Sequence, residues 1–241
     1  MISTLDNDAL VDLHDGLTFL TCHYIYKNVT DTFVSSFKKQ IGGGRLKDLI
    51  IVDNSPNTES LYSSDEIRVI DNHDYKLTKN NDDGKGISKN HCQTIDYILK
   101  NRIETNYCCL CDNDILFKPA IKNFIELHRK YDIVGEIGFD NWPPERLYPY
   151  LCLINVEKMK NCRLNYFDPM KMQLKNNTGF NPSCQWSYDT GCSFLEKVRK
   201  QPDWRIKKVK LTDFIVHKGA GSHSSRRISY AEFIQQNKAL L

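Results

Sequence analysis

The stretch YCCLCDND, residues 107–114, decides the fold of this chain. Its first five residues carry no charge and show no alternation of polar and apolar side chains, which is typical of a central strand in a parallel sheet covered by helices on both faces. Asp112 and Asp114 follow directly, and side chains two positions apart on an extended segment point the same way. The sequence therefore predicts a buried strand whose C-terminal end carries two carboxylates on one side.

Two adjacent carboxylates at this position indicate a cation site. Open α/β sheets bind ligands at the carboxyl ends of their strands. Asp112 and Asp114 repel each other unless a cation joins them, and no Lys or Arg follows them until Lys118. A hard divalent ion accepts carboxylate and phosphate oxygens together. We therefore expect a metal ion and a phosphate-bearing substrate at this end of the sheet.

Further apolar runs on either side of this stretch predict a mostly parallel α/β sheet over residues 17–137. The expected strands cover residues 17–20, 49–52, 67–70, 107–111 and 132–135, and the clearest helix runs from Ile87 to about Lys100. Four of these strands finish in a polar residue, which is Thr21, Asp53, Asp71 or Asp112. A single strand that finishes in a polar residue is ordinary turn chemistry. Four such strands, at the edge of the sheet where ligands bind, indicate a binding site.

From about residue 138 the sequence becomes richer in aromatic residues and proline. Strands are expected at 151–155, 206–209 and 214–216, with a helix beginning at Asp189-Thr190-Gly191. We expect one compact domain, with a polar leader at 1–16, a first half at 17–137, and a C-terminal half at 138–241.

Composition narrows the class of protein. The 241 residues are 40% hydrophobic, enough for one sizeable core, and the net charge of +3 gives no nucleic-acid footprint. The nine cysteines are odd in number and form no CxxC pair, which favours buried reduced thiols over disulfides or a zinc site. No apolar run approaches the roughly 18 residues of a membrane-spanning helix. A soluble, cytoplasmic protein is expected.

The order of these motifs resembles the GT-A fold glycosyltransferases that use nucleotide sugars, particularly the family-2-like inverting enzymes. The resemblance rests on the strand ending in Thr21, the segment 49–55 with Asp53, the helix opening at 86–90, and the DxD motif Asp112-Asn113-Asp114. Asp189 before a late helix and the strand-terminal His217 complete the order. The resemblance covers roughly residues 17–222 and is continuous only in the first half of the chain. The fold that the resemblance implies is a mixed, mostly parallel, Rossmann-like sheet flanked by helices. It also implies that residues 17–137 form the nucleotide-sugar-binding half and residues 138–241 the acceptor-binding and C-terminal half.

The resemblance also implies roles in donor binding. Asp53 would accept from the N3–H of a uracil-type base, and Thr21 would lie against base or ribose. Lys89 stands where the family often has an arginine near the nucleotide. The remaining residues carried over to the nucleotide site are Asn90, Asp112 and Asn113.

The metal and catalytic roles follow in the same way. Asp114 would ligate Mn²⁺ or Mg²⁺ directly, Asp112 would contact ribose, metal or a metal-bound water, and His217 would add a further metal or diphosphate contact. Asp189 matches the catalytic base, although Tyr188 replaces the acidic residue that usually precedes it. An Asp before Thr-Gly is equally a plain helix N-cap.

Three weaker expectations concern the substrates. Lys218 and Ser222 would belong to a loop over the phosphates, although basic loop residues are more often simply solvated. Trp142 would stack on an acceptor sugar, as would Tyr150, although core packing is the more common role for such rings. The acceptor itself would be a glycan, a protein or a small molecule.

Other functions compete with glycosyl transfer. A sugar nucleotidyltransferase would want a Gly-rich basic segment after the first strand, where this chain has Cys22-His23-Tyr24. A metal-dependent nuclease would show more acids and a more basic surface. A non-catalytic sugar- or protein-binding module on the same fold is a further alternative, against which the joint presence of Asp53, Asp112, Asp114 and His217 argues.

Overall fold

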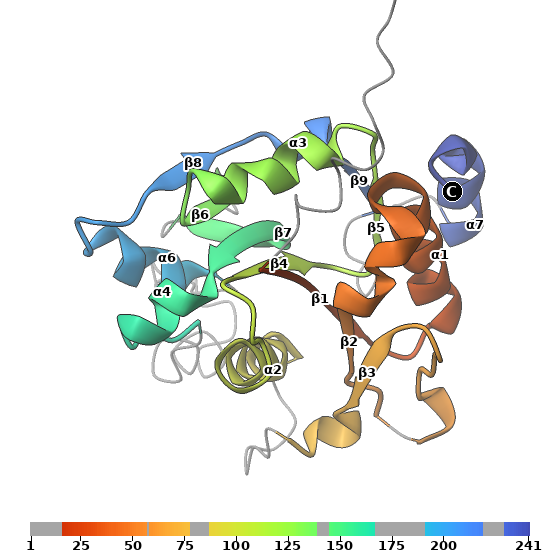
Figure 1. Ribbon diagram of the computed structural model, residues 1–241. Coiled ribbons are helices and arrows are strands. Elements are labelled where there is room, and N and C mark those ends of the chain that lie inside the picture. Colours follow the sequence, from red (N-terminus) through yellow and green to blue (C-terminus); the bar gives the residue numbers. More distant parts are fainter. Residues whose placement is uncertain (1–15, 57, 78–86, 139–144, 167–190, 219–228) are drawn as a thin grey trace, which may run out of the picture.

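The computed structural model describes residues 16–56, 58–77, 87–138, 145–166, 191–218 and 229–241, and for Ser60 and residues 87–90 it describes the backbone alone (Figure 1). The strands are β1 Leu17–His23, β2 Leu49–Asp53, β3 Arg68–Asp71, β4 Tyr107–Cys111, β5 Ile115–Phe117, β6 Ile133–Gly138, β7 Arg146–Asn155, β8 Ile206–Lys208 and β9 Ile215–His217. The helices are α1 Lys27–Phe37, α2 Ile87–Asn101, α3 Ile121–Glu126, α4 Val156–Asn161, α6 Cys192–Arg199 and α7 Tyr230–Gln236. Shorter helical turns span Lys38–Gly42, Gly43–Asp48, Thr58–Ser60, His73–Tyr75, Leu127–Arg129, Leu211–Asp213 and Lys238–Leu240.

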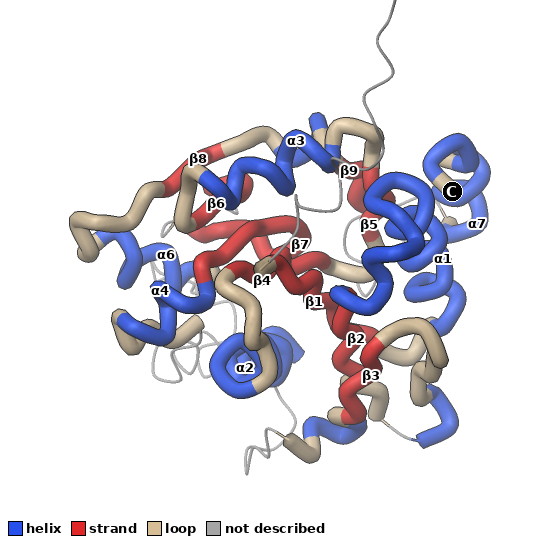
Figure 2. The backbone as a smooth tube through the Cα atoms, viewed as in Figure 1, coloured by secondary structure: helices blue, strands red, loops and turns tan. Residues whose placement is uncertain are grey.

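Seven of these strands form one mixed sheet in the order β3-β2-β1-β4-β7-β6-β8 (Figure 2). The pairs β3–β2, β2–β1, β1–β4 and β6–β8 are parallel, and β7 runs antiparallel to both of its neighbours. The sheet is therefore mostly parallel, which confirms the fold class predicted from the sequence. β4 lies at its centre, with β1 on one side and β7 on the other.

Each face of this sheet buries its own hydrophobic core. One core contains Phe33 and Phe37 of α1 with Phe124 of α3, and the other contains Ile95 of α2 with Phe194 of α6. The helices accordingly divide, with α1 and α3 over one face and α2, α4 and α6 over the other (Figure 1). Because β4 is covered on both faces, its four residues from Cys108 to Cys111 are all buried, which explains the uninterrupted apolar run.

β7 departs from the expected structure. Tyr148-Pro149-Tyr150 was expected in an aromatic, proline-rich segment before a strand at 151–155, but it lies within the ten-residue β7. Proline has no N–H for a sheet ladder. Pro149 fits because pairing with β4 begins only at Leu151, and pairing with β6 is irregular between Gly135 and Ile137.

A second, two-stranded sheet pairs β5 with β9 in antiparallel register, from Ile115 opposite His217 to Phe117 opposite Ile215. The strand β9 is close to the one expected at 214–216, whereas β5 was not expected. This small sheet matters because it begins directly after Asp114 and brings the C-terminal part of the chain beside it.

One domain contains all these described elements, since β7 lies between β4 and β6 and joins the two halves of the chain. The predicted boundary at residues 137 and 138 falls at the end of β6 and stays a prediction, as does the leader, because residues 1–15 lie outside the described part. Among the described residues, the helices are all too short or too polar to cross a bilayer.

We expect Gly191→Ala to lower the free energy of unfolding by at least about 2 kcal/mol. Gly191 precedes α6 with φ +86°, and a Cβ there would lie 2.1 Å from the carbonyl oxygen of Leu147 on β7. A matched control is Gly44→Ala, because a Cβ at Gly44 meets nothing within 4 Å. Urea unfolding monitored by circular dichroism measures both variants, and equal unfolding midpoints would contradict this packing of α6 on β7.

Candidate metal centre

The two carboxylates and one imidazole of the predicted site lie together at the carboxyl end of β4. Asp112 directly follows β4, Asp114 ends the turn into β5, and His217 is the last residue of β9. The N–H of Lys218 donates to the Asp114 carbonyl oxygen at 3.1 Å, which extends the β5–β9 pairing to the site. His217 thus reaches the acidic pair through the small sheet, from 103 positions away along the chain.

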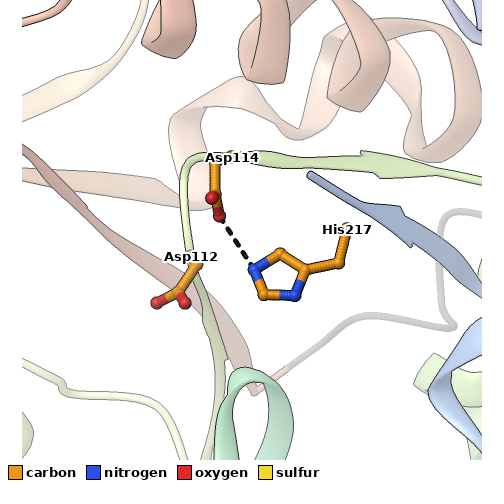
Figure 3. A group of neighbouring side chains, drawn as sticks. All are labelled: Asp112, Asp114 and His217. Atoms are coloured by element: carbon orange, nitrogen blue, oxygen red, sulfur yellow. Dashed lines mark hydrogen bonds and ion pairs between the residues drawn. The ribbon is translucent and has the colours of Figure 1, made fainter. Parts of the chain in front are cut away.

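The side chains are close enough to share one ion. One potential ligand atom from each of Asp112, Asp114 and His217 lies within 4.8 Å of the other two. Nε2 of His217 lies 3.1 Å from Oδ1 of Asp114, and Figure 3 shows this imidazole facing the carboxylate across the turn. We expected the carboxylates to converge because of the alternation of an extended strand. They converge instead through a turn at Asn113 and Asp114.

The electrostatics of the site favour a cation. Burial, together with the charge of Asp114, raises the pKa of Asp112 to about 7, although His217 and Arg146 oppose this shift. Like charges held close together at this partly buried site are costly, and a positive ion between them removes that cost. Carboxylate oxygens suit Mg²⁺ and Mn²⁺, and an imidazole is compatible with Mn²⁺. The donor set therefore fits a divalent ion.

The turn between Asp112 and Asp114 is fastened to α1. Nδ2 of Asn113 donates to Oγ1 of Thr30 at 3.0 Å, and Nδ1 of His23 lies 2.7 Å from the same hydroxyl. His23 and Thr30 are both fully buried. The amide of Asn113, which we expected to contact the nucleotide, therefore makes a contact that holds the turn in place.

The residues predicted to bind the nucleobase are buried in this conformation. Asp53 is 0% exposed, and its carboxylate accepts hydrogen bonds from the N–H groups of Ser55 and Tyr62. Thr21 is also 0% exposed, and it lies inside β1 beside Cys111 instead of ending the strand. The strand ends at His23, opposite Asp53, because pairing with β2 continues for two more residues. Contact between a base and Asp53 would have to replace the hydrogen bonds from Ser55 and Tyr62.

Only some of the other predicted site residues lie in the part of the chain that the structure describes. Lys89 and Asn90 lie in the first turn of α2, as expected, but their side chains are outside the description. Lys218 is partly exposed and follows β9 directly. The remaining predicted residues, Asp189, Trp142 and Ser222, lie outside the described residues, so these roles stay predictions.

Two side chains, Arg146 and Tyr150, interact with the site in ways that the sequence did not predict. Arg146, at the start of β7, is the cationic side chain that counteracts the raised pKa of Asp112. Tyr150 was considered for stacking on a sugar, but its ring stacks on the imidazole of His217, with centroids 4.4 Å apart and planes at 21°. No spacing rule indicated either contact, because both depend on how β7 crosses the end of β4.

The cysteines are as expected for the part of the chain described. Cys92, Cys108, Cys109, Cys111, Cys152 and Cys192 are buried and form no disulfide, while Cys22 is partly buried and Cys162 exposed. Burial raises the pKa values of Cys108, Cys109 and Cys152 well above that of an ordinary thiol. These side chains therefore act as small apolar groups in the core.

Comparisons with known proteins find similarity only among solved structures. No family model and no curated protein matches the sequence. The galactosyltransferase LgtC, in complex with donor and acceptor sugar analogues, is 12% identical with a TM-score of 0.49, covering 80% of this chain and 73% of its own. S. aureus TarS 1-349 in complex with UDP-GlcNAc is 14% identical with a TM-score of 0.47. The match covers 93% of this chain and 65% of that one.

A third similar structure is the mannosyltransferase PcManGT from Pyrobaculum calidifontis in complex with GDP-Man and Mn²⁺. It is 10% identical with a TM-score of 0.46, and the match covers 80% of this chain and 54% of that one. Two of these three structures are named as glycosyltransferases, but likenesses at this level carry no argument about what this chain binds or transfers.

Proposed function

We propose that this protein is a metal-dependent glycosyltransferase. It moves a sugar from a UDP-linked nucleotide-sugar donor to a hydroxyl of a glycan, protein or small-molecule acceptor, with inversion at the anomeric carbon. The observation that carries the proposal is the group of Asp112, Asp114 and His217 at the carboxyl end of the central strand. The family-2-like assignment and the cytoplasmic location are parts of the same proposal.

In this scheme Asp112, Asp114 and His217 would hold the ion. Bound there, Mn²⁺ or Mg²⁺ would supply Lewis-acid stabilisation of the charge that develops on the diphosphate. Lys218 follows His217 directly and supplies a positive charge close to the same group. The Asn113–Thr30 hydrogen bond keeps both carboxylates oriented while the donor binds.

The donor nucleotide would be held by the ends of β1 and β2 and the start of α2. Thr21, Asp53, Lys89 and Asn90 are the residues proposed for this role. Because Asp53 is fully buried and its carboxylate accepts hydrogen bonds from the N–H groups of Ser55 and Tyr62, donor binding at Asp53 would require these contacts to break. Trp142 and Ser222 remain proposed contacts with the acceptor and the phosphates.

The test of the function is a panel of nucleotide sugars with Mn²⁺, scored for release of free nucleoside diphosphate. A sugar nucleotidyltransferase would instead release pyrophosphate from a nucleoside triphosphate and a sugar phosphate. A binding module would hold a nucleotide sugar without turning it over. Release of nucleoside diphosphate from none of the donors, with or without acceptor sugars, would overturn the proposal.

We propose Asp189 as the base that takes the proton of the acceptor hydroxyl. Asp189→Asn is then expected to bind the donor normally and to lower kcat by about 10²- to 10⁴-fold, since that is the usual contribution of a general base. Donor affinity by calorimetry and kcat from diphosphate release measure the two effects separately. Wild-type turnover in this variant would leave Asp189 with only a capping role.

A further inference from the structure

A row of stacked side chains runs along β7 to the candidate metal centre. The guanidinium carbon of Arg146 lies 4.7 Å from the ring centroid of Tyr148. The ring of Tyr148 lies 5.1 Å from that of Tyr150, with planes at 30°, and Tyr150 stacks on His217. Residues 146, 148 and 150 alternate along the strand, so their side chains share one face. The row ends where His217 meets Asp114.

Tyr150 contacts the metal centre twice. Its ring lies against the imidazole of His217, and its carbonyl oxygen accepts a hydrogen bond from the N–H of Asp112 at 3.2 Å. The backbone contact fixes the start of the acidic turn, whatever the side chain at 150. The ring contact depends on an aromatic face at this position. Tyr150 therefore lies between a carboxylate ligand and the imidazole ligand of the same group.

His217 needs such support more than the two aspartates do. It ends a three-residue strand in a two-stranded sheet, and its side chain is 25% exposed. Asp112, by contrast, follows a strand that is hydrogen-bonded on both sides. A ligand must be held close to its productive geometry by neighbouring packing. The face of Tyr150 limits rotation of the imidazole about its side-chain bonds.

The other side chains of the row also restrict the ring of Tyr150, because Tyr148 packs against it. A Cβ at Gly138 of β6 would lie 3.1 Å from the ring of Tyr148, so the ring of Tyr148 lies close over this glycine. Arg146 packs on Tyr148 from the next position along the face. These contacts restrict the ring of Tyr148 and, through it, that of Tyr150.

We infer that Tyr150 is a positioning residue of the metal centre, which holds the imidazole of His217 in the orientation that ligates the ion. This inference rests on the proposed function, because it presupposes that the centre binds a divalent metal. Tyr150 itself contributes no ligand atom. The aromatic face is what it supplies, so its hydroxyl is dispensable for this role.

The experiment compares Mn²⁺ binding, by electron paramagnetic resonance, in the wild-type protein and in two variants at position 150. Tyr150→Leu is expected to lower Mn²⁺ affinity about 10-fold, within the range seen when groups that orient a ligand are removed. Tyr150→Phe keeps the face and is expected to retain wild-type affinity. Proton NMR of His217 provides a second measurement, since its ring protons are shifted by the stacked ring in the wild type and in Tyr150→Phe alone.

The chain provides a matched control in another tyrosine–histidine pair. Tyr107 begins β4 and contacts His128 with ring centroids 5.2 Å apart, at the opposite end of the strand from Asp112. Tyr107→Leu removes a partly buried tyrosine from the same core and should leave Mn²⁺ affinity unchanged. A loss of affinity in this variant equal to that in Tyr150→Leu would assign the effect to general packing and overturn the inference.

A double-mutant cycle distinguishes action through His217 from any other route. In the His217→Ala background, Tyr150→Leu should have no further effect on Mn²⁺ affinity. A full additional 10-fold loss would overturn the positioning role. A wild-type protein that binds no Mn²⁺ would overturn the proposed function itself, whereas equal affinity in wild type and Tyr150→Leu would overturn this inference alone.

Discussion

Asp114→Ala is expected to lower Mn²⁺ affinity by at least about 100-fold and to abolish the Mn²⁺-dependent part of both UDP binding and turnover. Asp114 lies between the other two candidate ligands, within hydrogen-bonding distance of His217 and in the same turn as Asp112. Its loss leaves one carboxylate and one imidazole as candidate ligands. Manganese titration by electron paramagnetic resonance and UDP titration with and without Mn²⁺ measure the effect.

The control for Asp114 is Asp213→Ala, which removes an exposed aspartate near the start of β9. It should bind Mn²⁺ and UDP as the wild type does. Metal-free Asp114→Ala should unfold close to the wild-type temperature, because removing one member of a like-charged pair offsets the lost hydrogen bond. Unchanged Mn²⁺-stimulated UDP affinity in Asp114→Ala would contradict the assigned metal centre.

The second large effect concerns stability. Asp132, just before β6, is 3% exposed. It accepts hydrogen bonds from the N–H of Arg205 at 2.9 Å, Nζ of Lys158 at 3.0 Å and Nδ2 of Asn155 at 3.1 Å. Asp132→Ala leaves these donors without their acceptor and is expected to cost about 3–5 kcal/mol of unfolding free energy. Urea unfolding measures it directly.

A suitable comparison is Asp71→Ala, since Asp71 also pairs with a cation, Lys76, but its side chain is 47% exposed. We expect a loss below about 1 kcal/mol there, because water screens exposed ion pairs. Equal losses at the two positions would show that the hydrogen bonds to Asp132 contribute no more than a surface contact.

The same group predicts an acid dependence of stability. Burial alone would raise the pKa of Asp132, but hydrogen bonds from Arg205, Lys158 and Asn155 outweigh it and hold the pKa below 3.8. A carboxyl with a lowered pKa in the folded state stabilises the fold above its unfolded pKa, and that contribution is lost as the pH falls through the folded value. The difference in stability between wild type and Asp132→Asn should therefore shrink below about pH 4. A constant difference across this range would contradict the assignment.

The central features of the fold follow from local sequence. The uncharged run before Asp112 predicts a strand covered on both faces, and β4 is covered in this way by two hydrophobic cores. The helix expected from Ile87 to about Lys100 is α2, Ile87–Asn101. These elements were predictable because burial on two faces and helical periodicity can both be recognised in a short stretch of sequence.

Other features depend on contacts that no short window contains. β5 has three residues, too few for a recognisable alternation, and it forms because β9 pairs with it across about a hundred positions of the chain. Without β5, the sequence named His217 as a ligand only through a resemblance and gave no reason for its closeness to Asp114. The stacking of Tyr150 on His217 likewise depends on two strands from distant parts of the chain.

The pairing of β5 with β9 has a consequence for folding. The last strand of the described sheets closes a loop of about a hundred residues for only a few hydrogen bonds, so it is a natural place for the native chain to open first. A cation that joins Asp112 and Asp114 to His217 would act as a reversible cross-link across that loop. At a hundred times its dissociation constant it would add about 2.7 kcal/mol to native stability. Manganese should then slow proteolysis of the C-terminal segment more than that of any other exposed region.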